Sequence, residues 1–165
     1  MEKAKIDEIY RQNATMEYKY LCGLTHDTGL AEELTQETFF QAIKGIDKFR
    51  GDCKVSVWLC QIAKNLWYKE LEKRNKHKTV ELDYTIPSGE NVENKSLNNL
   101  EKLEIFRLMH NLDDATREVM YLRLAGDLQF SEIADIVGKT ENWARVTYYR
   151  GKQKLLKGMI EWTEN

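Results

Sequence analysis

The sequence predicts an all-α protein built from two small helical domains that a flexible linker joins. Three observations carry this prediction. Apolar residues recur at helical spacing through most of the 165 residues, proline occurs once, and no convincing pair of strand segments is present. A chain of this length forms one ordinary domain or two small ones. Its hydrophobic fraction of 42% and charged fraction of 32% exclude the disordered class.

The first predicted domain, residues 1–76, contains three helices. Apolar residues at loosely helical spacing predict a helix over 4–24. A second helix is predicted over 28–46, with Thr28 as its N-cap, and a break around Gly51 follows it. The third helix, over 54–74, carries an apolar row that we expect on its core side: Val55, Leu59, Ile62 and Leu66.

The helical pattern lapses after residue 76, and residues 77–96 collect serine, glycine, asparagine and the one proline. This composition is typical of a linker, so we predict the domain boundary there. The second domain, residues 97–165, begins with a helix to about Asn111. A further helix opens at Asp113 or Asp114 and closes near Gly126.

The stretch "FSEIADIVGKTENWARVTYY" has the order of a helix-turn-helix motif. Gly138 can adopt the positive φ that ends a helix, and Thr140 is a good N-cap for the helix that follows. On the first helix, the predicted buried residues are Ile133, Ala134 and Val137. On the second helix, the predicted packing row is Ala144, Tyr148, Gly151 and Leu155.

The other side of this second helix predicts DNA contact. Residues 142–157 hold five bases and no acid, although the whole chain has a net charge of −2. Cations are favourable at the C-terminal end of any helix, because the helix dipole is negative there. Here, however, the turn, the cap and the apolar row all agree with a DNA-binding motif. The outward side chains can reach base edges and phosphates: Asn142, Arg145, Val146, Tyr149, Arg150 and Gln153.

Two neighbouring helices of the first domain carry opposite charges. Residues 27–43 hold four acids and no base, whereas residues 54–78 hold seven bases and two acids. Cations beside aromatic rings suit unpaired nucleic acid, because bases stack on the rings while the cations neutralise phosphates. Taken alone, the acidic helix is typical of a solvated face, and Trp58 and Trp67 are typical of core or half-core positions.

Cysteine and histidine usage predicts neither a disulfide framework nor a metal site. Cys22, Cys53 and Cys60 are odd in number and form no C-x-x-C pair, so we expect buried or half-buried fillers. The three histidines fall on no metal-ligand spacing: His26, His77 and His110. No phosphate-binding glycine loop or nucleophile elbow occurs, and we therefore expect no cofactor, no metal and no catalytic residue.

No apolar run approaches the roughly 20 residues of a membrane span. The N-terminal stretch "MEKAKIDEIYRQ" lacks the apolar core of a signal peptide. We therefore expect a cytoplasmic protein without membrane insertion.

Three ordered segments resemble those of bacterial sigma factors. "GLAEELTQETFFQAI" resembles their second conserved helix, and "FRGDCKVSVWLCQIAKNLWYKELEKR" is similar to the segment that follows it. "LRLAGDLQFSEIADIVGKTENWARVTYYRGKQKL" is similar to their C-terminal helix-turn-helix. Two domains with none between them resemble the extracytoplasmic-function (ECF) group of the sigma-70 family.

The resemblance implies a promoter-specificity subunit of RNA polymerase. The first domain would be a sigma region 2-like bundle and the second a sigma region 4-like helix-turn-helix domain. The implied partners are the clamp helices of the largest polymerase subunit, the flap of the second-largest subunit, promoter DNA and an anti-sigma factor. The residues implied to bind the clamp helices are Glu33, Gln36, Glu37 and Phe40.

The same resemblance implies two contacts with promoter DNA. In the first domain, a base of the opened minus-10 element would be splayed out near the "DKFRGDCK" loop. The implied minus-10 residues are Lys54, Trp58, Gln61, Lys64, Asn65, Tyr68 and Lys69. The implied minus-35 residues are Thr140, Asn142, Trp143, Arg145, Val146, Tyr149, Arg150 and Lys152.

Two other functions fit parts of the sequence. A one-component transcription regulator would explain the helix-turn-helix, but it gives no reason for an acidic helix beside a basic, aromatic one. Such a regulator binds duplex DNA unaided, usually as a dimer. A helical adaptor that binds only proteins would leave the basic stretch as a solvated face, and salt-sensitive DNA binding would argue against it.

Overall fold

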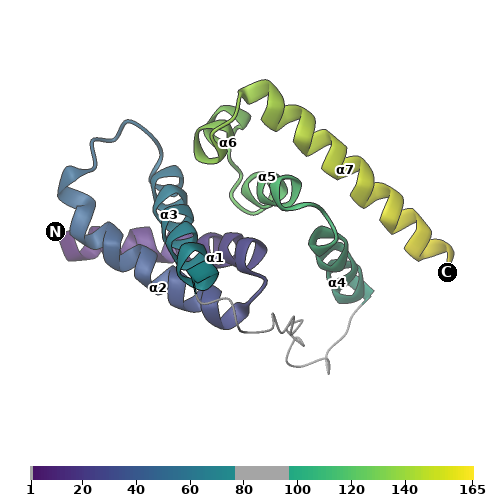
Figure 1. Ribbon diagram of the computed structural model, residues 1–165, viewed down its shortest axis with the longest axis horizontal. Helices are drawn as coiled ribbons and strands as arrows, with labels where there is room; N and C mark the ends of the chain where they lie inside the picture. The colour runs from purple at the N-terminus through teal and green to yellow at the C-terminus, as the bar shows by residue number, and fades with distance from the viewer. Residues whose placement is uncertain (1, 77–96) are drawn as a thin grey trace. The chain divides into compact units, whose positions relative to one another are not determined.

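The computed structural model describes residues 2–76 and 97–165, and each regular element within these ranges is a helix (Figure 1). The all-α prediction is therefore confirmed for the described residues. They form two compact units, which we call unit 1 (α1 to α3) and unit 2 (α4 to α7). The predicted linker, residues 77–96, lies outside the described ranges.

Unit 1 is a bundle of three helices, α1 (Glu2–Thr25), α2 (Thr28–Gly45) and α3 (Val55–Lys76), with a short 3-10 helix at Ile46–Lys48. Each predicted helix is confirmed to within two residues at either end. The predicted N-cap of α2 is wrong by one residue. Asp27 has extended backbone angles and its carboxylate accepts a hydrogen bond from the Leu30 N–H at 3.1 Å, so Thr28 is already helical.

The core stripe of α3 differs from the predicted apolar row. Its buried residues include the small side chains of Cys60 and Ala63, while Val55, Ile62 and Leu66 of the predicted row are only half-buried. Leu59 is the member of the row that is fully buried, and it packs with Phe39 and Ala42 of α2. Small residues let helices approach closely, so they mark a core face that large aliphatic residues alone do not show.

A buried carboxyl group links α1 to α3. Glu17 is fully buried, and the Cys60 thiol donates a hydrogen bond to its Oε1 at 3.2 Å. The other oxygen, Oε2, has no hydrogen-bond partner among the described residues. Burial raises the pKa of Glu17 to about 8, and the Cys60 hydrogen bond offsets only part of that rise. Glu17 is therefore mostly a neutral acid at pH 7.

The predicted burial of the cysteines is confirmed. Cys60 is buried, and Cys22 and Cys53 are half-buried. Burial also raises the pKa of the Cys22 thiol.

Unit 2 contains α4 (Leu97–His110), α5 (Asp114–Leu124), α6 (Phe130–Val137) and α7 (Glu141–Glu164). Of the two candidate caps of α5, Asp113 is the cap. Its carboxylate accepts hydrogen bonds from the Thr116 N–H at 3.1 Å and the Thr116 hydroxyl at 2.6 Å. These bonds hold the pKa of Asp113 below its usual range.

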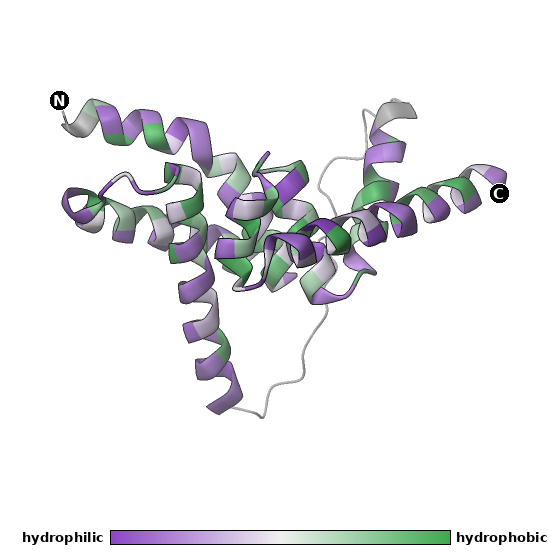
Figure 2. Cartoon of the chain, turned by 90° about the horizontal axis from the view of Figure 1, so that it is seen from above, coloured by the Kyte–Doolittle hydropathy of each residue, from purple (hydrophilic) through white to green (hydrophobic). Residues whose placement is uncertain are grey.

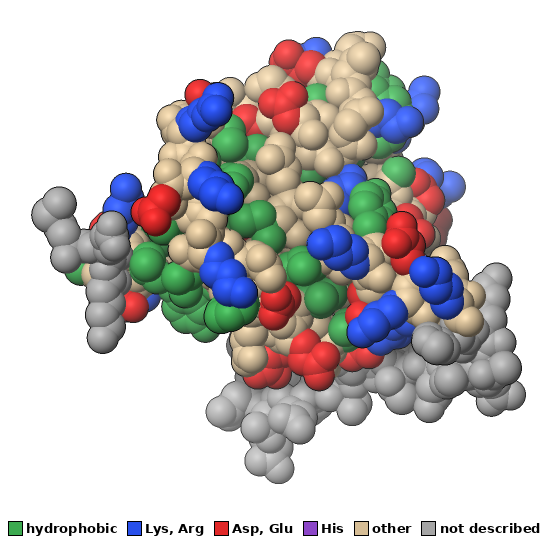
Figure 3. Space-filling model, turned by 60° about the vertical axis from the view of Figure 1, so that its left-hand side comes forward, with side chains coloured by type: hydrophobic (Ala, Val, Ile, Leu, Met, Phe, Trp, Pro, Cys, Tyr) green, Lys and Arg blue, Asp and Glu red, His purple; other side chains and the backbone are tan. Residues whose placement is uncertain are grey.

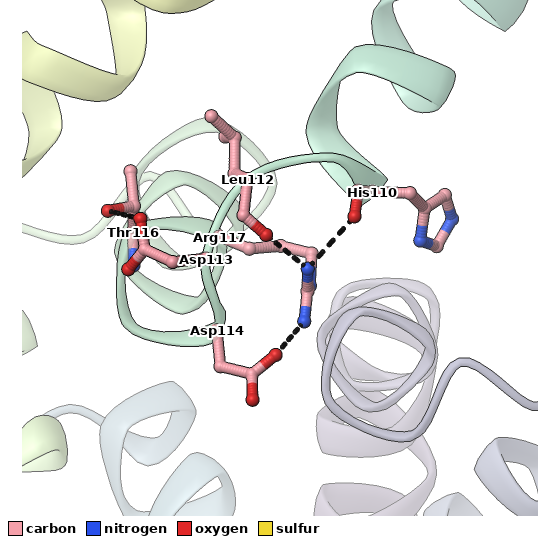
Figure 4. A network of polar contacts seen from close by, with 6 residues as sticks. All are labelled: His110, Leu112, Asp113, Asp114, Thr116 and Arg117. Atoms are coloured by element: carbon pink, nitrogen blue, oxygen red, sulfur yellow. Dashed lines mark hydrogen bonds and ion pairs between the residues drawn. The ribbon is translucent and has the colours of Figure 1, made fainter.

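Arg117 ties the end of α4 to the start of α5 (Figure 4). Its side chain is 3% exposed, and its Nη1 donates to the carbonyls of Leu112 at 2.7 Å and His110 at 3.2 Å. Its Nη2 forms an ion pair with Asp114. The carbonyls at a helix C-terminus lack intrahelical partners, so Arg117 serves as a side-chain cap for α4.

The helix-turn-helix is confirmed as α6 and α7. Gly138 ends α6 with φ of 72°, and the Thr140 hydroxyl caps α7 by accepting from the Trp143 N–H at 3.0 Å. Ile133 and Ala134 are buried as predicted, whereas the third buried residue is Ile136 and not Val137.

The packing row of α7 also lies where the sequence predicts it. Ala144 and Gly151 are buried, and Tyr148 and Leu155 pack against a core cluster that contains Met109 and Met120. A Cβ at position 151 would lie 2.8 Å from the Met120 sulfur, so Gly151 permits close contact between α5 and α7. Figure 2 shows hydrophobic and hydrophilic residues alternating along the helix that ends at the C-terminus.

Candidate nucleic-acid interface

The N-terminal half of α7 presents most of the predicted minus-35 residues to solvent. Those that are exposed are Asn142, Arg145, Val146, Tyr149, Arg150 and Lys152. Tyr149 is 51% exposed and Val146 is 38% exposed, and both are apolar groups that can meet a base edge. Burial of Ala144 and Gly151 on the other side fixes which side of the helix faces solvent.

Several of the predicted minus-35 residues also make contacts within unit 2. The Thr140 hydroxyl is engaged in capping α7. Trp143 is half-buried, and the Lys139 ammonium lies 5.8 Å from its ring centroid. Arg145 is restrained as well, because its guanidinium donates to the Glu141 carboxylate at 3.0 Å.

Six of the seven predicted minus-10 residues share the outward side of α3. They are exposed or half-buried: Lys54, Trp58, Gln61, Asn65, Tyr68 and Lys69. Lys64, the seventh predicted residue, is buried instead and only 8% exposed. It lies one turn after Cys60 on the buried stripe, with its ammonium 5.5 Å from the Tyr68 ring centroid.

A pocket of about 380 Å³ opens between the end of α2 and the outward side of α3. Trp58 forms one wall, and its indole stacks on Phe49 with ring centroids 4.7 Å apart. The lining combines aromatic rings, amides, cations and aliphatic groups: Gln41, Gly45, Lys48, Phe49, Trp58, Ile62, Asn65, Leu66 and Lys69. Aromatic rings can stack on a nucleobase, and cations beside them can neutralise the adjacent phosphates.

Three polar or aromatic lining residues were not predicted as site residues. Lys48 and Phe49 belong to the "DKFRGDCK" loop, near which the resemblance implies that a base is splayed out. No sequence pattern indicated that Gln41 would line a base-binding site. It lies on α2 one helical turn after Glu37, which was predicted to bind the polymerase. Its amide donates to the Glu37 carboxylate at 2.8 Å.

The four predicted polymerase residues share one face of α2. Glu33, Gln36 and Phe40 are exposed, and Glu37 is half-buried. Phe40 is 51% exposed and its neighbour Ile43 is 47% exposed, so an apolar spot lies beside the acids. The Lys44 ammonium lies 4.2 Å from the Phe40 ring centroid, at the end of the acidic stretch.

Charge on the remaining surface is mixed. On the face that Figure 3 shows, cationic, anionic and apolar side chains lie among one another, in line with a net charge of −2. Within residues 2–76 and 97–165, no three His, Cys, Asp or Glu side chains come together as a metal site would need. None of the helices in these ranges has the length and apolar character of a membrane span.

Both units match known protein families. Residues 9–77 match the family model for Sigma-70 region 2, and residues 102–155 match the model for Sigma-70, region 4. A one-component regulator gives no reason for a region 2, so that alternative is not favoured.

Individual relatives match over nearly the whole chain. The ECF RNA polymerase sigma factor SigM of Bacillus subtilis (strain 168) is 30% identical over 151 residues, which cover 91% of this chain and 92% of SigM. The RNA polymerase sigma factor YlaC of the same organism is 28% identical over 160 residues, covering 94% of this chain and 92% of YlaC.

A solved structure supports the fold. The sigma factor RpoE of Bartonella quintana, solved in complex with the anti-sigma factor NepR, matches with a TM-score of 0.76. The match covers 94% of this chain and 96% of RpoE, at 18% identity. Two sigma-70 regions in the expected order, together with relatives that align over more than nine-tenths of the chain, assign the chain to the ECF sigma factors, the polymerase-binding subunits that confer promoter specificity.

Proposed function

We propose that unit 1 opens the minus-10 element and captures one of its bases in the pocket between α2 and α3. The observation that carries this proposal is the lining of that pocket, where Trp58 offers a ring and Asn65 and Gln41 offer amides. Lys48 and Lys69 supply cations at the same place for the phosphates on either side of the base. Melting then results from binding to the separated strand and needs no catalytic residue.

Unit 2 reads the minus-35 element with α7 in the major groove. The exposed residues Arg145, Tyr149 and Arg150 lie on the side of α7 opposite its packing row, as in other helix-turn-helix proteins that read base edges. Lys152 and Asn142 extend the same side and reach phosphates. Asn142 and Thr140 lie at the N-terminus of α7, where the helix dipole also favours phosphate.

The acidic face of α2 binds the clamp helices of the largest polymerase subunit. Glu33 and Glu37 provide charge for a basic partner surface, and Phe40, about one helical turn after Glu37, provides an exposed apolar anchor. Gln36 completes this face. Unit 2 binds the flap of the second-largest subunit.

The same proposal covers the mode of action and a regulatory partner. Sigma factors are non-catalytic regulators, and this chain acts by binding in the cytoplasm, where the polymerase is. The RpoE structure contains an anti-sigma factor, and we expect a partner of that class to hold this chain inactive.

Trp58→Ala is expected to reduce promoter opening by about tenfold or more. A base stacked on an aromatic ring is worth about 1–3 kcal/mol, and this change removes the wall on which the base would stack. The measurement is permanganate reactivity of unpaired thymines in the minus-10 element, with holoenzyme assembled from core RNA polymerase and the full chain.

Two matched variants separate stacking from folding. Trp58→Phe keeps an aromatic wall and should retain most of the opening. Trp67→Ala removes a half-buried tryptophan of the same helix that does not line the pocket, and it should leave opening within about twofold of the unmodified chain. Equal loss of opening in Trp58→Ala and Trp67→Ala would contradict a base-binding role for the pocket.

A further inference from the structure

Phe130, the first residue of α6, lies at the centre of a cluster of rings and cations. Its ring centroid is 5.5 Å from that of Tyr148 and 6.3 Å from that of Tyr149. Two guanidinium groups also lie over this ring, that of Arg123 at 4.6 Å and that of Arg145 at 5.6 Å. Tyr149 and Arg145 are exposed residues that are proposed to read the minus-35 element. The Phe130 ring therefore contacts two of the residues proposed to bind DNA.

A hydrogen bond fixes Arg123, the member of this cluster that does not belong to α6 or α7. Arg123 belongs to α5, and its Nη1 donates to the carbonyl of the buried residue Leu128 at 2.7 Å. Its guanidinium therefore stays over the Phe130 ring without help from α7. Phe130 itself is only half-buried, so part of its ring remains available to the side chains of α7.

Arg145 is restrained from two directions. Its Nη2 donates to Glu141 one turn earlier on α7, and its guanidinium carbon lies over Phe130 of α6. Its side chain is still 46% exposed, so it is held in place without being removed from solvent. Tyr149 likewise packs against both Phe130 and Tyr148, and its ring centroid lies 5.4 Å from that of Tyr148 in an edge-to-face arrangement.

We propose that Phe130 is a positioning residue for reading the minus-35 element, because its ring orients Arg145 and Tyr149 before DNA binds. The proposal rests on the proposed function of α7. It adds that sequence specificity depends on Phe130, a side chain of the first helix of the motif, and that this side chain does not itself contact DNA. A long side chain that is already ordered loses less conformational entropy on binding, which favours the one base pattern that fits its fixed geometry.

A purely structural role for Phe130 makes a different prediction. If the ring only packs α6 against α7, its loss lowers affinity for all DNA sequences and does so whether or not Arg145 is present. If it orients Arg145, its loss affects the matching sequence and has little further effect once Arg145 is gone. A double-mutant cycle distinguishes the two roles.

The test uses holoenzyme with the full chain and measures binding to two duplexes. One carries the minus-35 element of a promoter recovered by sequencing run-off transcripts, and the other carries the same duplex with that element scrambled. The variants are Phe130→Leu, which keeps an apolar side chain but removes the ring, and Phe130→Tyr, which keeps the ring. Phe106→Leu, at an exposed phenylalanine of α4 outside the cluster, is the matched control.

The expected result is a loss confined to the matching duplex. Phe130→Leu should lower the preference for the matching over the scrambled element by about three- to tenfold, with Phe130→Tyr and Phe106→Leu close to the unmodified chain. Arg145→Ala should lower this preference by about tenfold or more, and Phe130→Leu added to Arg145→Ala should lower it little further.

Three outcomes would overturn the proposal, and a fourth would overturn the proposed function on which it rests. An additive loss in the double variant, or an equal loss on both duplexes for Phe130→Leu, would make Phe130 a packing residue only. An unchanged preference for Phe130→Leu would remove any role in positioning. If Arg145→Ala and Tyr149→Ala both leave the preference intact, α7 does not read the element in the proposed way.

Discussion

Unit 1 is expected to lose on the order of 4 kcal/mol of stability as pH rises from about 5 to about 8, because of Glu17 alone. The folded unit holds this carboxyl with a pKa of about 8, whereas an exposed glutamate has a value of 4.5. Below pH 4.5 the group is protonated in both states and the full stability is present. Between the two pKa values the unfolded chain releases the proton and the folded unit keeps it, so stability falls with rising pH. Above about pH 8 the loss is complete.

Glu17→Gln should remove most of this pH dependence. The amide keeps the shape of the protonated acid and carries no charge to desolvate, so the variant should be more stable than the unmodified chain at pH 8 and above. The measurement is urea unfolding of the full chain between pH 5 and 9, followed by the amide NMR signals of α1 and α3. Asp7→Asn, the same chemical change at an exposed acid of α1, is the control. Parallel pH profiles for Glu17→Gln and the unmodified chain would show that Glu17 is not the group responsible.

Arg117→Ala is expected to destabilise unit 2 by roughly 2–4 kcal/mol. The carbonyls of His110, the last residue of α4, and of Leu112, in the turn that follows, lose a donor, and the change also removes a side chain that is almost fully buried. The value follows from a hydrogen-bond cost of about 1 kcal/mol or more for each carbonyl, together with lost packing. Urea unfolding followed by the NMR signals of α5 and α7 measures the change.

A second readout of Arg117→Ala lies at His110. Burial, and after it the charge of Arg117, lowers the pKa of this histidine, so removing the guanidinium should move that pKa upward. Lys102→Ala removes an exposed cation of α4 and should change stability by no more than about 0.5 kcal/mol. A stability loss for Arg117→Ala as small as that of the control would contradict its role as the cap of α4.

The helix order and most helix ends could be predicted because the signals are local. Gly138 and Thr140 act within one turn of their own positions, so their roles follow from residue type and spacing alone. The cap of α2 shows the limit of such reasoning. Asp27 and Thr28 are both good capping residues, and only the backbone angles of the turn between α1 and α2 decide between them.

The core face of α3 and the pocket depend on how helices pack, which spacing within one helix does not reveal. Cys60 and Ala63 are small enough to be buried at close approach, and this turns Lys64 inward and leaves Ile62 to line the pocket. Gln41 joins the site because α2 passes beside α3 at that point. The outward residues of α7 were predictable because Gly151, on the opposite side, fixes the packing side of that helix.

Assembly of the chain with core RNA polymerase tests the central claim most directly. The purified chain is mixed with core enzyme and fragmented genomic DNA of the source organism, the mixture is resolved by size, and run-off transcripts are sequenced. We expect the chain and the core enzyme to co-elute and new start sites to appear, preceded by a shared pair of minus-35 and minus-10 elements. Tight, selective binding of the isolated chain to intact duplex, with no co-elution and no new start sites, would contradict it.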